Sequence, residues 1–325
     1  MLRRPAIVIP LLVLVAGLAC ALRLAVGGDG LGFAADGTIA ELRWLRVICG
    51  LGVGAGLAVA GVMLQSLLRN PLASPDLLGL SAGAGLAVLI TAYAGYRATG
   101  AIVPPATEPV PAVLGACAAL AIVFGLSQRR GFVDPVTLIL VGVIVGIVCG
   151  SAGSVVKSLL PDGGFQASRL LLGRLSDDTP WPLAWLGLGA ATVGAGIGVR
   201  LGPSMDASSM GDDEASSVGV AIGPLRAWLF VTAGVLTALS VVIAGPIGFV
   251  GLVVPHAARL MLGPAHAPLT VASALLGGAV VVAGDALVRS IELPTGRLSV
   301  GVVTALIGGP VFILMLRSML TRRVF

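Results

Sequence analysis

Long apolar runs, each close to the length that crosses a lipid bilayer, follow one another along the whole chain. A helix needs about 20 apolar residues to cross the hydrocarbon core of a membrane. Hydrophobic residues make up 57% of the 325 positions and charged residues 11%, a composition outside the range of ordinary soluble domains. We therefore expect an all-α, polytopic membrane protein, with residues 1–325 forming a single transmembrane domain.

Ten helices are expected to cross the membrane, because charges and proline or glycine breaks separate ten apolar runs. The expected helices lie near residues 5–26, 46–68, 79–96, 109–127, 136–158, 181–200, 225–243, 246–263, 268–289 and 300–319. An even number of crossings places both termini on one side, and the arginines near each terminus indicate that this side is the cytoplasm. The first run is interpreted as a membrane helix, because the residues before Cys20 match a lipoprotein cleavage site poorly.

The types of residue present argue against several kinds of site. The four cysteines lie in apolar stretches without CxxC spacing, which indicates neither a disulfide framework nor a zinc site. Basic residues do not alternate with aromatic ones as they do in nucleic-acid grooves. The single lysine, Lys157, lacks the preceding glycine of a phosphate-binding loop. If ATP drives this protein, another chain binds it, and this chain is expected to be neither an enzyme nor the holder of a cofactor.

Two segments interrupt the apolar pattern with proline, glycine and charge. The first, 65–85, is expected to form a rigid elbow near the cytoplasmic mouth, because proline fixes φ and removes a hydrogen-bond donor. Its elbow residues are Arg69, Asn70, Pro71, Pro75 and Asp76. The second, 244–256, is expected beside a translocation path, because irregular backbone at membrane depth must be buried in protein or line a cavity. Its path-lining residues are Gly245, Pro246, Gly248 and Gly251.

Two connections are long enough to carry structure of their own. The loop 201–223, expected on the cytoplasmic side, contains a stretch that begins with acids and ends at glycine. This pattern predicts a short helix, a natural docking element between two spans. The other connection, 162–178, is expected on the outer side, with a partial helix lying along the membrane.

Ionisable groups near or inside the spans leave alternatives open. Asp285 precedes Arg289 by four residues, which favours a helix-end ion pair, although a secondary transporter would use such an acid as its proton site. His256 is interpreted as a structural residue, since a membrane-embedded enzyme built around it lacks the acidic or histidine partners that catalysis needs. The outward arginines either reach lipid phosphates or meet a partner protein.

Three long runs occur in a fixed order, namely RNPLASPDLLG at 69–79, GPIGFVGLVVPH at 245–256 and GVVTALIG at 301–308. Through these runs the chain resembles the FecCD/BtuC-type permeases of iron-siderophore, haem and cobalamin ABC importers over nearly its whole length. The resemblance implies a ten-helix subunit that pairs with a second permease, identical or homologous, around a central path. It also implies two copies of an ATP-binding subunit that hold ATP and Mg²⁺, an extracytoplasmic substrate-binding protein, and a place in the lipid of the bacterial inner membrane.

The resemblance further implies roles for individual residues. In that family a Gly-Asp-x-x-Ala-x-x-x-Gly-like pattern docks on the ATPase, and the residues in comparable places here are Gly211, Asp212, Glu214, Ala215 and Gly219. Outward arginines of the family meet acids of the binding protein, and those in comparable places are Arg43, Arg46 and Arg289.

The family's gates lie near the loop before the fifth helix, where this chain has Asp134, Pro135, Val136 and Thr137. One departure concerns the Glu-Leu-Pro that usually stands just before the final helix. Here Glu292-Leu293-Pro294 comes several residues earlier, which leaves the role of Arg297 open.

The function predicted from these features is that of the transmembrane permease of an ATP-driven importer for an iron-siderophore-type metal chelate. Such a permease would move its cargo by alternating access, while the soluble receptor supplies most of the specificity. The alternatives are a haem or cobalamin importer permease and, less favoured, a proton-coupled secondary transporter.

Overall fold

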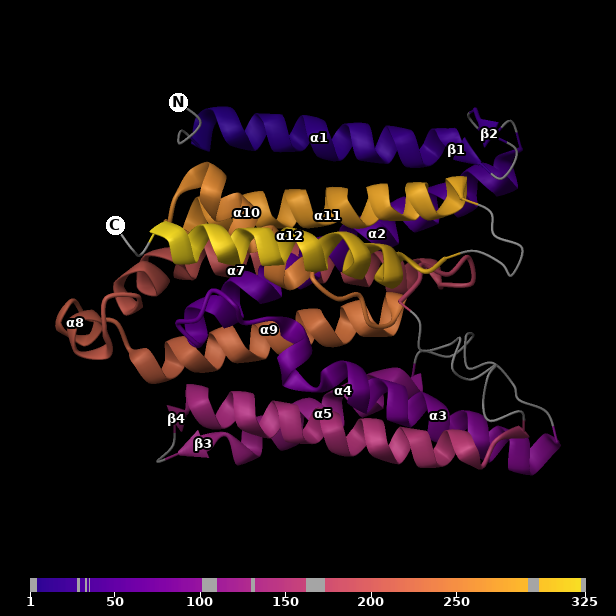
Figure 1. Cartoon of the computed structure of the whole chain (residues 1–325), viewed down its shortest axis with the longest axis horizontal. Helices are drawn as coiled ribbons and strands as arrows, with labels where there is room; N and C mark the ends of the chain where they lie inside the picture. Colours follow the sequence, from indigo (N-terminus) through magenta and orange to yellow (C-terminus); the bar gives the residue numbers. More distant parts are fainter. Residues whose placement is uncertain are drawn as a thin grey trace.

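The computed structural model describes residues 5–27, 30–32, 34, 36–100, 110–129, 132–161, 173–291 and 298–322. This part of the chain is almost entirely helical (Figure 1). The long helices are α1 Pro5–Ala25, α2 Gly37–Leu67, α3 Leu80–Thr99, α4 Val110–Leu126, α5 Pro135–Ser158, α7 Trp181–Ser208, α9 Ile222–Ala244, α10 Val250–Leu262, α11 His266–Ser290 and α12 Val300–Arg322. The remaining elements are the short helix α8 Asp212–Ser217, the 3-10 turn η1 Pro75–Leu78 and the strands β1 Val26–Gly27, β2 Gly30–Leu31, β3 Gln128–Arg129 and β4 Phe132–Val133.

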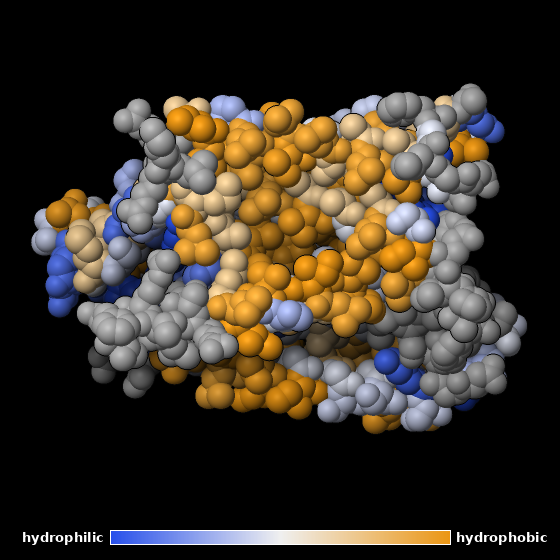
Figure 2. Space-filling model, turned by 45° about the horizontal axis from the view of Figure 1, so that its top comes forward, coloured by the Kyte–Doolittle hydropathy of each residue, from blue (hydrophilic) through white to orange (hydrophobic). Residues whose placement is uncertain are grey.

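Each of the ten expected helices is present, so the all-α, polytopic prediction is confirmed. Within the described residues, six helices are long and apolar enough to cross a membrane, and three shorter apolar helices accompany them. The space-filling view shows a broad apolar band across the molecule, with hydrophilic surface gathered toward its two ends (Figure 2). This is the surface expected of a helical bundle whose middle lies in lipid.

The long helices run between two ends of the molecule, which are named here by the elements they carry. The α8 end also carries the β3–β4 hairpin and the N-terminus, and the β1 end carries the β1–β2 hairpin (Figure 1). Each hairpin consists of two antiparallel strands of two residues. These hairpins cap helix ends and form no extended sheet within the described part of the chain.

Helix α2 is the centre of the bundle. Of its most apolar stretch 89% is buried, and it packs on α7, α9, α10 and α11. Glycine makes this crowding possible, because a Cβ at Gly54 would lie 2.2 Å from the carbonyl oxygen of Gly277, and one at Gly61 would lie 1.9 Å from that of Gly251. In lipid, close backbone approach of this kind supplies the dispersion contacts that hold helices together.

Three expected helix boundaries were wrong by more than a turn, and one of them is the start of α10, which lies at Val250 instead of 246 because the chain at 245–249 is irregular. Helix α2 begins at Gly37, nine residues before the predicted start at 46, and Asp36 caps it by accepting a hydrogen bond from the Thr38 amide at 2.8 Å. Its first turns carry charge and so fall outside any apolar run, which is why hydropathy missed them. Helix α7 continues through Pro203 to Ser208, past the predicted end at 200. These last turns were missed because they also fall outside any apolar run.

The expected partial helix at 162–178 lies mostly outside the described residues. Its described part, 173–178, is not helical. The Glu292-Leu293-Pro294 segment and Arg297 also lie outside the described residues.

The close contact between α2 and α11 gives a stability prediction. Gly54→Val should destabilise the protein by about 1–3 kcal/mol or more, because the new side chain would overlap the backbone of α11. Thermal unfolding of the purified protein in detergent measures this change. Gly17→Val in α1 is the matched control, since nothing lies within 4 Å of a Cβ there. Equal melting temperatures for the two variants would contradict the packing described here.

Candidate functional site

The short helix α8 projects beyond the ends of the long helices (Figure 1). Its first turn carries Asp212, Asp213 and Glu214, whose negative charges are favourable at a helix N-terminus. Ala215 is fully buried and fastens the helix to the bundle, while its carbonyl accepts a hydrogen bond from the Val220 amide at 3.0 Å. Gly219, with φ of 88°, ends the turn after the helix. The short helix expected within 201–223 is therefore present.

Asp212 connects α8 to two other parts of the bundle. Its carboxylate forms ion pairs with Arg69, at the start of the elbow, and with Arg226 of α9 at 2.8 Å. This contact between the elbow and the acidic helix could not be predicted, because 143 residues separate Arg69 from Asp212. These two ion pairs place α8 in contact with both the elbow and α9.

The elbow leads from the α8 end toward the middle of the bundle. At its start Arg69 adopts a left-handed φ of 46°, and the Asn70 side chain accepts a hydrogen bond from the Leu72 amide at 2.9 Å. At its end Gly79 packs so closely on α5 that a Cβ would lie 2.7 Å from the Gly142 carbonyl oxygen. Gly142 lies seven residues after Pro135, the first residue of α5, and so about 10 Å along the helix from its N-terminus.

The Arg69 end of the elbow lies at the α8 end of the molecule, where it pairs with Asp212, and the position of the elbow near the cytoplasmic mouth stays a prediction. The chain then turns back into the bundle before α3 begins, and Asp76 stands in the η1 turn, near Gly248. Proline explains the return, since Pro75 opens the η1 turn and no α-helix forms between Leu67 and Leu80.

The second irregular segment, 245–249, lies against the elbow. Helix α9 stops at Ala244 and α10 starts only at Val250, with left-handed φ values of 69° at Gly245 and 67° at Phe249. A Cβ at Gly251 would lie 2.5 Å from Pro75 Cδ, and one at Gly248 would lie 3.9 Å from an Asp76 carboxylate oxygen. The two breaks that the sequence showed separately are therefore neighbours inside the bundle, and their lining of a path stays a prediction.

A cluster of arginines and aspartates occupies the β1 end. Asp285 is 2% exposed and accepts hydrogen bonds from Arg23 Nε at 2.5 Å and Arg46 Nη1 at 3.0 Å. The interpretation that Asp285 pairs with Arg289 was wrong. The guanidinium of Arg289 instead reaches Asp177 in the loop before α7, at 2.8 Å, while α1 and α2 bring their arginines onto Asp285.

Asp177 joins this cluster from the connection between α5 and α7. It pairs with both Arg46 and Arg289. Burial alone would raise the pKa of Asp177, but the hydrogen bonds and charges of the two guanidinium groups outweigh it and lower the pKa to about 2. Sequence reasoning missed Asp177 and Arg23, because neither lies in a recognisable motif and their partners are more than 100 residues away.

The three arginines proposed for docking are all engaged within the chain. Arg46 is 7% exposed, and Arg43 donates to the carbonyls of Leu24 at 2.5 Å and Gly32 at 2.7 Å, which holds the chain around the β1–β2 hairpin. Arg289, held by Asp177, keeps 20% of its side chain exposed. Their role toward a partner protein stays a prediction.

The residues proposed as a gate form the start of α5. Asp134 caps the helix by accepting a hydrogen bond from the Thr137 amide at 2.9 Å, and Pro135 occupies the first turn. The Asp134 amide also donates to the Ser127 carbonyl at 2.9 Å, across the β3–β4 hairpin. These residues lie at the α8 end, and their gating role stays a prediction.

Comparison with known proteins gives consistent matches. A family model described as the FecCD transport family matches residues 8–318. The chain is 34% identical to the cobalamin import system permease protein of Halobacterium salinarum, over 86% of this chain and 73% of that protein. It is 35% identical to an Fe(3+)-citrate import system permease protein of Bacillus subtilis, over 86% of this chain and 81% of that protein.

A solved structure resembles the fold over almost its whole length. That solved structure is of a metal-chelate type ABC transporter in an inward-facing conformation. It matches this chain with a TM-score of 0.81 and 25% sequence identity. The match covers 97% of this chain and 99% of that chain.

The lowered pKa of Asp177 predicts a pH dependence of stability. Because the folded-state pKa of about 2 lies below the ordinary value of 3.8, the ionised carboxylate stabilises the fold above pH 4 or so and loses this effect as pH falls toward 2. The stability difference between the wild type and Asp177→Asn should therefore be constant from neutral pH to about pH 5 and shrink below it. Thermal unfolding across this range measures the difference.

Asp178→Asn is the control for this prediction, because the neighbouring Asp178 carboxylate contacts Ser176 and no described arginine. A difference between Asp177→Asn and the wild type that stays the same down to pH 3 would contradict the pairing of Asp177 with Arg46 and Arg289.

Proposed function

The chain belongs to the FecCD transport family and is a permease of an ABC importer, and from this premise we propose that it imports an iron-siderophore-type metal chelate by alternating access. The energy would come from ATP and Mg²⁺ bound in two copies of a separate ATPase subunit. A second permease, identical or homologous, would complete the central path, and an extracytoplasmic binding protein would deliver the cargo.

The observation that carries the proposed mechanism is the bridge of Asp212 to Arg69 and Arg226. Helix α8 is the element best placed to receive a push from an ATPase, because it projects from the bundle and is fastened to it through Ala215. The bridge passes that push to the elbow, whose far end rests on α5 at Gly79. In this mechanism Gly211, Asp212, Glu214, Ala215 and Gly219 form the coupling surface.

The proposed orientation places the α8 end in the cytoplasm and the β1 end outside the bacterial inner membrane. Both termini then lie in the cytoplasm. Support comes from the arginines at the two termini and from the position of α8, since an ATPase is reached only from the cytoplasmic side.

The relatives of this chain differ in the cargo they import. The relatives named above import cobalamin in one case and Fe(3+)-citrate in the other, at nearly equal identity. The motif Arg-Asn-Pro-Leu-Ala-Ser-Pro-Asp at 69–76 favours a siderophore-type chelate. A haem or cobalamin cargo is the alternative. The secondary-transporter alternative loses support, because Asp285 is packed between two guanidinium groups and reaches no cavity identified in the described part.

The first test is purification of the tagged chain from native membranes, with mass spectrometry of the proteins that accompany it. A P-loop ATPase and its activity should be recovered with the permease. Reconstituted into proteoliposomes with its binding protein, the complex should take up a ferric chelate only when ATP is supplied. Uptake that survives without ATP and collapses with an uncoupler would contradict the proposal.

The Asp212 bridge gives a second prediction. Asp212→Arg should lower ATP-driven uptake about tenfold, a typical coupling free energy between two sites, because it repels Arg69 and Arg226 together. Adding Arg69→Asp should recover part of the uptake by re-forming one ion pair. Asp213→Asn is the matched control, since Asp213 stands in the same turn and pairs with no described arginine. Full uptake by Asp212→Arg would remove the bridge from the mechanism.

A further inference from the structure

A cavity of about 250 Å³ lies in the half of the bundle nearer the β1 end. Its walls come from the first half of α3, the second half of α5, the end of α9 and the irregular residues Gly245 and Pro246. No atom lies within 4 Å of a Cβ built on Gly150, which lines it. The cavity therefore continues directly from one of the two backbone breaks of the candidate site.

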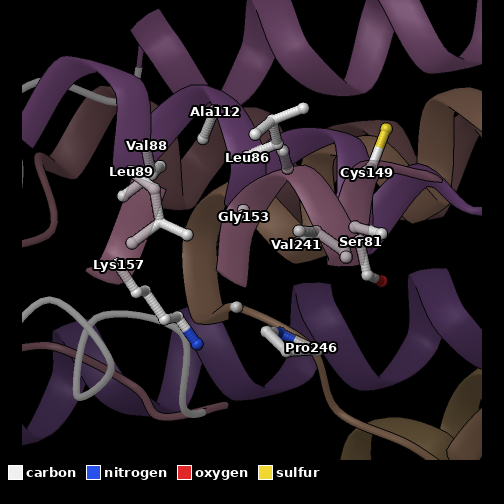
Figure 3. A pocket seen from close by; sticks show the side chains of 15 residues that line it. Ser81, Leu86, Val88, Leu89, Ala112, Cys149, Gly153, Lys157, Val241 and Pro246 are labelled. Carbon is white, nitrogen blue, oxygen red and sulfur yellow. The ribbon is translucent and has the colours of Figure 1, made fainter. Parts of the chain in front are cut away.

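Among the described residues that line this cavity, Lys157 is the single charged one. Figure 3 shows its side chain at one end of the cavity, beside Pro246, with Cys149 and Ser81 toward the other end. The remaining lining residues are small or aliphatic. Burying an ammonium group against such walls is costly unless water or an anion solvates it.

The Lys157 side chain is half-buried and has no hydrogen-bond or ion-pair partner among the described residues. The acids of the cluster at the β1 end do not pair with Lys157, because Asp177 and Asp285 each pair with two arginines. The Lys157 side chain differs in this from the arginines at the β1 end, each of which donates at least one side-chain hydrogen bond within the chain, namely Arg23, Arg43, Arg46 and Arg289.

A second cation stands close to the same backbone segment. The Arg174 amide donates to the Ala244 carbonyl at 2.7 Å, directly before Gly245. The Arg174 side chain is exposed and, within the described part of the chain, has no ion-pair partner. Within the described residues, Arg174 and Lys157 thus both lie next to the segment 244–246 in the fold, and neither side chain has an ion-pair partner.

We propose that this cavity is a binding subsite of the translocation path for a negatively charged part of the carried solute, with Lys157 as its charged contact. The inference rests on the proposed function and narrows its cargo to chelates that keep net negative charge after binding iron. The cavity is smaller than the roughly 300–1,000 Å³ of sites that enclose a whole small molecule. It therefore holds one edge of the chelate and leaves the rest in the path.

The native Cys149 supplies a probe inside the same cavity. In a complex whose permease keeps Cys149 but carries Cys20→Ala, Cys49→Ala and Cys117→Ala, the rates of labelling by two methanethiosulfonates are compared, one with a sulfonate and one with a trimethylammonium group. Lys157 lies eight residues from Cys149 along α5, which is about 12 Å. At this separation its charge should favour the anionic reagent in the parent protein.

Lys157→Gln should lower the ratio of anionic to cationic labelling rates by about threefold to tenfold, as expected for one charge at this distance in a partly screened cavity. Lys157→Arg should keep the ratio. Arg97→Gln is the matched control, because Arg97 is an exposed cation at the end of α3 that does not line the cavity. An unchanged ratio in Lys157→Gln, an equal drop in Arg97→Gln, or no labelling of Cys149 would each overturn the subsite.

Protection experiments test the class of ligand. Ferric citrate, which is anionic, should slow Cys149 labelling in the parent protein and leave Lys157→Gln unaffected. A neutral ferric trihydroxamate at the same concentration should protect neither. Equal protection by both chelates, or by none, would overturn the anionic preference.

These readouts are independent of transport. A chain that purifies with an ATPase and takes up cargo, yet shows no effect of Lys157, would remain an importer permease without this subsite. A chain that purifies without an ATPase would still reveal the charge of the cavity through the labelling ratio.

Discussion

Inside a bilayer every backbone group that leaves a helix needs a partner from the protein, and this requirement organises the centre of the structure. The two irregular segments satisfy this requirement by lying against each other and against neighbouring segments of the same chain. The Arg174 amide reaches the Ala244 carbonyl at 2.7 Å, and the Gly301 amide reaches that of Gly173 at 2.8 Å. Glycine on α2 and α10 removes the side chains that would otherwise keep these backbones apart. Close helix packing and broken helices therefore depend on the same residues.

The charged groups divide the molecule into a rigid end and a yielding end. At the β1 end the side chains of Arg23, Arg46 and Asp285 are 4%, 8% and 2% exposed, and breaking a buried pair by removing one partner costs about 3–5 kcal/mol. At the α8 end those of Arg69 and Asp212 are 40% and 42% exposed, where an ion pair contributes about 0–1 kcal/mol. The Asp212 bridge thus contributes little to stability, whereas buried ion pairs hold α1, α2 and α11 together.

Much of the fold could be predicted from the sequence, because apolar length alone marks helices that must span lipid. The acid-started helix α8 followed from its own residues as well. What could not be predicted was pairing between distant residues. Asp285 lies four residues from Arg289, yet its partners come from α1 and α2, since tertiary packing of helices outweighs local spacing. The charged start of α2 escaped detection because hydropathy measures the lipid-facing length of a helix and not its whole length.

The helices fall into two groups that meet along a limited seam. Helices α3, α4 and α5 pack on one another, whereas α2 is surrounded by α7, α9, α10 and α11 (Figure 1). The first group reaches the second mainly through α9 and the elbow. The cavity beside Lys157 lies on this seam, since α3 and α5 form one wall and the end of α9 with the 245–249 break forms the other. A shift of the α3–α5 group, driven through Arg69 and the elbow, would therefore change the cavity before it disturbed the buried ion cluster.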